Sequence, residues 1–433
     1  AHATEKRTTF GPFPNPFPTA DTLFVQVGPP DLEDPILGRV WGNGTTISLN
    51  FSEAMAAGVG TDPANFSVVK DGGSAVAVVA AGFSPGTDTI VLTTATPLDP
   101  SAAYTVTTSN LTDVAGRSLS GSNAAGFRTW DDNPAGVKVF VLAGQSNMVG
   151  YGQSEQGNGG VNGAIGSLRY EVNNDPANYG QLVDGGGNWI SRSDVKVWWN
   201  KAQPGQGDNI VKGDLDIGFA SNSSRIGPEY GFGWRVGDTY TEDVLLIKTA
   251  WGGKSLHVDF RPPSAVANRG GEVGPFYTLM IDQIHQVLDD LQTEFGSFTN
   301  GYQIVGFGWH QGWNDRITGA YATDYEVNLV DLINDVRLEL GNPALPVSIG
   351  TTGMEPNANP SILNAVEEAQ LAVADSMLHP GFAGTVDTVD TRSFWRVTAV
   401  SPANQGFHWN QNGETYFLIG DAMGANMVDL LTP

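Results

Sequence analysis

The chain of 433 residues has no cysteine, few positive charges and no long hydrophobic run. Without cysteine there is no disulfide, thiol nucleophile or thiolate metal site. Only 22 Lys and Arg residues stand against 46 Asp and Glu residues, which gives a net charge of −24. This charge repels phosphate backbones and anionic lipids, so we expect neither a nucleic acid nor a membrane surface as partner. Every apolar run is shorter than the roughly 18 residues of a membrane helix, which argues against membrane insertion.

The texture of the sequence separates three regions. Residues 1–20 alternate proline with aromatic residues and predict an extended arm, because proline cannot donate to a hydrogen-bond ladder. Residues 21–130 contain short β-branched runs between turn residues and predict an antiparallel β-sandwich. After a polar joint, residues 137–433 form the second predicted domain. The first four residues carry neither the charged nor the apolar part of a signal peptide, so we expect such a segment to be absent or already removed.

The second domain alternates apolar runs with helical patterns, as at 276–291 and 325–340. Five apolar runs predict strands at 137–143, 244–250, 302–309, 345–349 and 385–390. Such alternation predicts an α/β fold with a parallel sheet covered on both faces. The chemistry of these folds collects where the strands end at their carboxyl side. The long Gly/Asn/Ser-rich stretch at 150–241 is either functional or contains unrecognised elements.

Chemically active side chains follow several of these strands. Ser146 comes directly after the first strand and is the candidate nucleophile. The pair Gly252 and Gly253 follows the second strand, where a backbone N–H can face a developing oxyanion. His408 precedes the C-terminal helical pattern, and the ordinary pKa of histidine suits a base that accepts a serine proton. Taken singly, a serine at this junction is an ordinary helix cap and paired glycines are an ordinary turn.

The combination of motifs resembles a known superfamily. Gly144-Gln-Ser-Asn-Met148, the Gly252-Gly253 pair, Trp309-His-Gln-Gly312 and a late histidine are similar to the SGNH hydrolases, and within them to the sialate O-acetylesterase-like and carbohydrate esterase family 6-like branch. This resemblance spans 137–433 and implies a flavodoxin-like three-layer fold that removes O-acetyl groups from sugars without a metal or other cofactor. It implies Ser146 as nucleophile and His408 as base, with the Ser146 N–H, a glycine N–H of the 252–253 turn and the Gln311 amide as oxyanion donors.

The motifs do not assign the acid of the catalytic triad. Many superfamily members carry it three residues before the histidine, but that position is Gln405 here, and Trp313 stands where the branch often has Glu. Asp315 on the same loop is the preferred acid and Asp390 the alternative, and a Ser–His dyad oriented by a backbone carbonyl is the remaining option.

Substrate recognition is assigned to aromatic residues near the strand ends. Indole faces pack on the apolar face of sugar rings, so we expect Trp251, Trp313 and Trp409 to contact substrate, together with Glu229 of the matching Gly227–Phe232 segment. The acidic chain disfavours an anionic glycan, which makes acetyl xylan-like hemicellulose the favoured substrate. The histidines have no metal-ligand spacing, so we expect no metal site.

Two other functions remain open at this point. The chain can be a sialate O-acetylesterase or an esterase for another acyl group, or a non-catalytic glycan-binding surface protein that has lost its acid. Within 21–130, three segments resemble bacterial Ig-like domains, which are attached to secreted and surface enzymes: Asn50–Met55, Leu98–Val106 and Leu111–Arg117. That resemblance implies a spacer or docking module without chemistry of its own, in a secreted, periplasmic or cell-surface protein.

Overall fold

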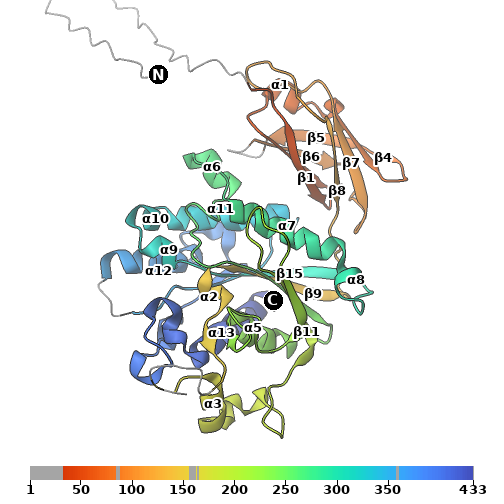
Figure 1. The fold of residues 1–433 in the computed structure, drawn as a ribbon. Coiled ribbons are helices and arrows are strands. Elements are labelled where there is room, and N and C mark those ends of the chain that lie inside the picture. Colours follow the sequence, from red (N-terminus) through yellow and green to blue (C-terminus); the bar gives the residue numbers. More distant parts are fainter. Residues whose placement is uncertain (1–32, 84–87, 156–161, 163–164, 357–359, 433) are drawn as a thin grey trace, which may run out of the picture.

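The computed structural model describes residues 33–83, 88–155, 162, 165–356 and 360–432, arranged as two domains (Figure 1). The predicted arm at 1–20 lies outside the described residues. The first domain consists of two four-stranded antiparallel sheets, which confirms the predicted sandwich. Their strands, in spatial order, are β1 (Leu37–Asn43), β2 (Thr46–Phe51), β6 (Thr89–Thr94) and β5 (Val78–Phe83), then β4 (Ala75–Val76), β3 (Phe66–Lys70), β7 (Ala103–Thr108) and β8 (Ala124–Arg128).

A single apolar core lies between these two sheets. Ile47, Leu49, Ile90, Leu92 and Val106 are fully buried there. Polar and exposed residues alternate with buried ones along β3 and β7, as expected when one face of a sheet is solvated. Two short helices complete the domain, α1 (Ala57–Gly60) and η1 (Pro63–Asn65).

The second domain contains a seven-stranded sheet that is parallel except at one edge. Its order is β12 (Ile210–Leu215), β11 (Arg192–Asn200), β14 (Val244–Ala250), β9 (Val137–Gly144), β15 (Tyr302–His310), β16 (Val347–Gly350) and β17 (Val386–Val389). The five predicted strands are confirmed as β9, β14, β15, β16 and β17. They follow the flavodoxin-like order, with β9 between β14 and β15, and β11 and the antiparallel β12 extend the sheet inside the long 150–241 stretch.

Helices cover both faces of this sheet and complete the expected three layers (Figure 1). Helices α7 (Pro275–Asp289), α11 (Tyr325–Glu339) and α12 (Pro360–Val373) pack on one face through their apolar stripes. Helices α5 (Pro228–Gly237) and α13 (Gly413–Leu431) pack on the other. Within the part of the chain that the structure describes, no helix combines the length and apolar character needed to cross a bilayer.

Short elements occupy the connections of this domain. They are α2 (Ser146–Val149), β10 (Gly152–Gln153), α3 (Leu168–Asn174), α4 (Pro176–Tyr179), η2 (Gly180–Leu182), β13 (Arg225–Ile226), α6 (Pro263–Arg269), α8 (Leu291–Glu294), α9 (Trp313–Arg316), α10 (Gly319–Thr323), η3 (Pro380–Phe382), η4 (Thr391–Phe394), η5 (Thr398–Val400) and η6 (Gly406–Gln411). The chain places β14 on one side of β9 and the later strand β15 on its other side, so the strand order reverses at β9. The ends of β14, β9 and β15 therefore form the switch point where such folds bind ligands.

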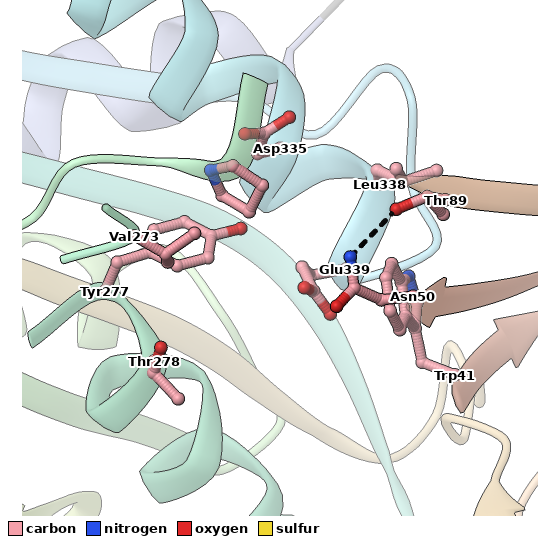
Figure 2. A pocket seen from close by; sticks show the side chains of 10 residues that line it. Trp41, Asn50, Thr89, Val273, Tyr277, Thr278, Asp335, Leu338 and Glu339 are labelled. Atoms are coloured by element: carbon pink, nitrogen blue, oxygen red, sulfur yellow. Dashed lines mark hydrogen bonds between the residues drawn. The ribbon is translucent and has the colours of Figure 1, made fainter. Parts of the chain in front are cut away.

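The two domains meet along α11. The buried Trp130 indole donates a hydrogen bond of 3.0 Å to the Glu339 carbonyl at the end of that helix. A cavity of about 210 Å³ remains between the domains. Figure 2 shows residues of both domains around it, with Trp41, Asn50 and Thr89 on the sandwich and Tyr277, Asp335 and Glu339 on the helices.

Candidate functional site

The candidate nucleophile lies in a tight turn between β9 and α2. Gly144 ends the strand at a φ of 156°, and a Cβ there would lie 2.2 Å from the His310 carbonyl oxygen of β15. Only glycine therefore allows the two strand ends to approach this closely. Ser146 begins α2, and the first N–H groups of a helix have no intrahelical acceptor. The Ser146 N–H is thus available to a developing oxyanion.

Gln145 fixes this turn to the end of β15. Its side-chain oxygen accepts hydrogen bonds from the Gln311 amide (3.1 Å), the Gly312 N–H (3.1 Å) and the Asn314 N–H (3.2 Å). Its amide nitrogen lies 3.5 Å from Ser146 Oγ. Gln145 is 1% exposed, so these bonds form away from water. Sequence reasoning assigned no specific role to this residue, although its place beside the serine was a signal.

A hydrogen-bond chain brings the predicted base close to the predicted nucleophile. Asn147, which follows Ser146, donates a 3.1 Å hydrogen bond to the carbonyl of Phe407, which precedes His408. The Tyr416 hydroxyl of α13 donates to Asn147 Oδ1 at 2.8 Å. The turn with Ser146 and the loop with His408, 262 positions apart in sequence, are therefore joined at the same edge of the sheet.

The imidazole of His408 is held in an environment that keeps it neutral. Its ring stacks on Tyr151 with 3.8 Å between centroids and 12° between planes. Burial, and secondarily the charge of Arg225, lowers the pKa of His408 to about 4. A neutral imidazole is the form that accepts a serine proton. Among the described residues, His408 Nδ1 is buried and has no hydrogen-bond partner.

Asp315 braces a neighbouring loop. Its carboxylate accepts hydrogen bonds from the Leu256 N–H (2.9 Å), the His257 N–H (3.0 Å) and the Gln311 amide (2.6 Å). Burial raises the pKa of Asp315 to about 6, although these three donors act in the opposite direction. Over the described ranges, no hydrogen bond joins Asp315 to His408. These contacts do not support the predicted role of Asp315 as the triad acid.

The alternative acid, Asp390, has other partners as well. Its carboxylate is paired with the guanidinium of Arg392 and caps the short helix η4. The hydrogen bond and charge of Arg392 hold the pKa of Asp390 below its usual range. The side chain of Asp390 is 42% exposed, so this pair is solvated, and within the described residues no hydrogen bond joins Asp390 to the buried His408 Nδ1.

The predicted oxyanion donors divide into two groups. Gly252 and Gly253 form an open turn after β14, with Gly253 at a φ of 70°, and the Asn314 amide donates to the Gly253 carbonyl. The Gln311 amide nitrogen, in contrast, lies within hydrogen-bonding distance of Gln145 Oε1, the Lys254 carbonyl and Asp315 Oδ2. Because an amide has two N–H groups, Gln311 is fully engaged and braces the site instead of facing a substrate.

Three of the four predicted substrate contacts are inside the protein, which corrects that part of the sequence analysis. Trp251 is 4% exposed and donates a 2.7 Å hydrogen bond to the Ala202 carbonyl. Trp409 is fully buried. Glu229 is also fully buried and forms a 2.6 Å ion pair with Lys248. Strand-end residues were expected to line the sheet edge, but neighbouring helices and loops cover these three.

The fourth predicted contact, Trp313, belongs to an aromatic rim beside His408. Its partly exposed ring lies 5.9 Å from that of Phe407, which is 41% exposed. Phe407 is adjacent to His408 in sequence and their rings lie 4.5 Å apart. Sequence reasoning missed Phe407, because a phenylalanine next to a histidine carries no signal of its own. In the described residues, no three His, Asp or Glu side chains gather in a way that could hold a metal ion.

We predict different outcomes for the two aspartates. Asp390→Asn is expected to leave kcat within about twofold of wild type, because exposed ion pairs contribute little. Asp315→Asn replaces an acceptor of three N–H groups by an amide and is expected to cost about 1–3 kcal/mol of stability. Thermal unfolding and acetate-release kinetics measure both effects. A loss of about 10⁴ in kcat with unchanged unfolding would instead identify the altered aspartate as the triad acid.

Family models match both domains of the chain. The family model of the carbohydrate esterases described as sialic acid-specific acetylesterases matches residues 136–393. The model of the bacterial Ig-like domain matches residues 39–129. His408 lies beyond the matched esterase range, so its assignment depends on the contacts described above. No curated protein matches the chain.

Several solved structures are similar at low identity. A protein of Arabidopsis thaliana is 18% identical, with 68% of this chain and 98% of that chain covered and a TM-score of 0.42. A carbohydrate acetylesterase from Xanthomonas citri is 13% identical over 90% of this chain and 73% of that chain, with a TM-score of 0.39. A family two carbohydrate esterase from Clostridium thermocellum, in complex with cellohexaose, is 14% identical over 90% and 94%, with a TM-score of 0.31.

The esterase model spans more than half of the chain and includes the turn with Ser146, both glycines of the 252–253 turn and the loop with Trp313. The Ig-like model matches the β-sandwich, which precedes the esterase domain in the sequence. The chain therefore belongs to the carbohydrate esterases of the sialic acid-specific acetylesterase family and is a carboxylic ester hydrolase with an N-terminal bacterial Ig-like domain.

Proposed function

We propose that the protein removes acetyl groups from a neutral polysaccharide, with acetyl xylan-like hemicellulose as the favoured substrate, through Ser146 and His408. The observation that carries this proposal is the hydrogen bond between Asn147 and the Phe407 carbonyl, which holds the serine turn against the histidine loop. An enzyme for such a polymer acts outside the cell, and the Ig-like domain is consistent with an extracellular location.

The proposed reaction proceeds in two steps. Ser146 Oγ attacks the acetyl carbonyl carbon while His408 accepts the serine proton. The bond between the acetyl carbon and the sugar oxygen then breaks as His408 transfers this proton to the sugar oxygen, which leaves as a hydroxyl group. Water hydrolyses the acetyl-serine with His408 again as base, which releases acetate and restores the serine. The N–H groups of Ser146 and of the 252–253 turn stabilise the negative oxygen of each tetrahedral intermediate.

The rim favours an uncharged sugar. Trp313 and Phe407 present apolar faces of the kind that pack on a pyranose ring. The carboxylate of sialic acid would need a cation. Arg316 lies 5.2 Å from the centre of the Trp313 ring and Arg225 lies 5.2 Å from the centre of the Tyr151 ring, and both already donate to other groups. Arg225 donates to Ser221 Oγ and Gln411 Oε1, and Arg316 donates to the backbone carbonyls of residues 352 and 354.

Acetate release from a panel of substrates tests the proposal. We expect wild type to deacetylate acetylated xylan faster than O-acetylated sialic acid, and Ser146→Ala to release acetate from neither. Acetate release from the sialic acid ester alone would contradict the neutral-substrate proposal. Preference for longer acyl chains in 4-nitrophenyl esters would contradict the acetyl assignment. No ester hydrolysis by wild type, with binding to the glycan retained, would favour a non-catalytic glycan-binding protein.

The pH dependence of the reaction is a separate prediction. Because burial lowers the pKa of His408 to about 4, the base stays deprotonated down to that pH. We therefore expect kcat/KM for 4-nitrophenyl acetate to be nearly constant from pH 8 to about pH 5.5 and to fall below about pH 4.5. The free-enzyme pKa of the base appears in this profile. An acidic limb centred near 6.5, the ordinary value for histidine, would contradict the burial of His408.

A further inference from the structure

The position that often carries the triad acid has another task in this chain. Gln405 lies three residues before His408, and its side-chain oxygen accepts a 2.5 Å hydrogen bond from the Gln411 amide. Its backbone carbonyl accepts the His408 N–H at 2.8 Å. Gln405 therefore shapes the loop but supplies no charge to the imidazole. Because Asp315 and Asp390 are committed to other donors, another group must orient His408 if it is the base.

His408 Nδ1 has no hydrogen-bond partner among the described residues, but the face of the imidazole ring is in contact with an aromatic ring. Tyr151, two residues after α2, lies parallel to the His408 ring at 3.8 Å. We propose that Tyr151 is a positioning residue that fixes the plane of the His408 ring by stacking and so takes over the orienting task of the missing acid. This inference rests on the proposed function, in which His408 is the base. Tyr151 acts through His408 and needs no contact with the substrate.

The backbone after His408 adopts an unusual conformation that neighbouring side chains hold in place. The three residues that follow it, Trp409, Asn410 and Gln411, have φ values of 51°, 53° and 56°. Left-handed conformations are unfavourable for residues other than glycine and persist only when surrounding contacts enforce them. The Asn410 side chain supplies such contacts by accepting the Gln405 N–H and donating to the Arg396 carbonyl.

Tyr151 is itself held in place by the neighbouring strand β13. The Arg225 guanidinium lies 5.2 Å from the Tyr151 ring centre, and it donates a 3.0 Å hydrogen bond to Gln411 Oε1. The stack, the cation and the strained turn are thus one connected unit. Among the described residues, Arg225 on β13 is the charge that acts on His408 and Tyr151 is the titratable side chain stacked on it. The Glu355 carboxylate lies against Gly406, two residues before His408. Among these groups, Arg225 and the burial by Tyr151 both favour the neutral imidazole.

Substitution of Tyr151 tests the inference through kinetics and titration. Tyr151→Phe keeps the aromatic face and is expected to retain kcat within about twofold. Tyr151→Leu removes the stack, which is worth roughly two- to twelvefold in an equilibrium, and is expected to lower kcat by up to about tenfold with little change in KM. It also admits water to the ring, so the acidic limb of kcat/KM is expected to move from about pH 4 toward 6.5.

A matched control separates stacking from general loosening of the loop. Trp395 packs on Trp409, the residue after His408, with 6.1 Å between centroids and does not stack on the imidazole. Trp395→Leu is expected to leave the acidic limb where wild type has it. NMR titration of ¹⁵N-labelled histidine, with the His408 signal assigned by its loss in His408→Gln, measures the pKa of His408 directly. This measurement does not depend on activity, so it can also be made on an inactive variant that remains folded.

The outcomes distinguish this inference from the proposed function. If Ser146→Ala and His408→Gln abolish acetate release while Tyr151→Leu matches Tyr151→Phe in kcat and in the His408 titration, the positioning role is wrong and the esterase proposal stands. If Ser146→Ala remains active, the proposed function fails whatever Tyr151 does. If Trp395→Leu shifts the titration as far as Tyr151→Leu, the effect belongs to loop packing and the positioning role is again wrong.

Discussion

Ser146→Ala and His408→Ala are each expected to lower kcat for acetate release by more than about a thousandfold. The serine oxygen forms the covalent bond and the histidine moves its proton, so loss of either ends the covalent route. In a serine protease, loss of either residue costs about as much as loss of the entire triad. Only stabilisation of the oxyanion and substrate binding remain, which is why a small residual rate is expected instead of none.

The structure provides a control for each of these variants. Ser393→Ala removes an exposed serine, and His379→Gln removes a partly exposed histidine bonded to Glu326. Both are expected to keep wild-type kcat. A serine-directed phosphonate is expected to label wild type and His379→Gln but not Ser146→Ala. Activity of Ser146→Ala within tenfold of wild type would overturn the assignment of the nucleophile, and labelling at another serine would show where it is.

The five central strands were predictable because they are buried on both faces. All eight residues of β9 and all seven of β14 are buried, so each strand appears in the sequence as a mainly apolar run, interrupted by Lys138 in β9 and by Lys248 and Thr249 in β14. The strand β11 was missed because its first half is charged. Arg192 pairs with Asp194 and Asp238, and Lys196 pairs with Asp214 of β12. Near the edge of a sheet, such alternating charges look like a loop.

The sequence predicted which residues of the site lie at the edge of the sheet, because this depends only on where the strands end. Ser146 and the glycine turn follow neighbouring strands, which places them at one edge by topology alone. The direction of a carboxylate is not determined in this way. Asp315 lies in the same motif as Gln311, but its hydrogen-bond donors include Leu256 and His257, almost sixty residues earlier in the chain. The burial of Trp251 and Trp409 likewise depends on distant segments that cover them.

The second large effect is expected from the buried ion pair formed by Glu229, a residue that the sequence analysis assigned to substrate binding. Lys248 and Glu229 are both fully buried, with 2.6 Å between Nζ and the carboxylate. Lys248 also donates to the carbonyls of Val149 (2.9 Å) and Phe219 (2.6 Å). Burial raises the pKa of Glu229 and lowers that of Lys248, and the short contact opposes both shifts. The ammonium thus joins α5 to the end of α2, the helix that begins with Ser146.

Lys248→Met is expected to cost about 3–5 kcal/mol, because it leaves Glu229 as an unpaired buried charge. For a large domain, that corresponds to a fall in Tm of about 6–20 °C. Lys196→Met is the matched control: it removes a lysine from the adjacent strand β11 whose partner Asp214 is 42% exposed, and it is expected to cost less than about 1 kcal/mol. Calorimetry of both variants measures the difference. Equal melting temperatures of the two variants would mean that the Glu229–Lys248 pair does not hold α2. We expect instead that Lys248→Met melts at a lower temperature and that it alone has a reduced kcat at temperatures well below its Tm. That result connects this buried pair to the position of the nucleophile.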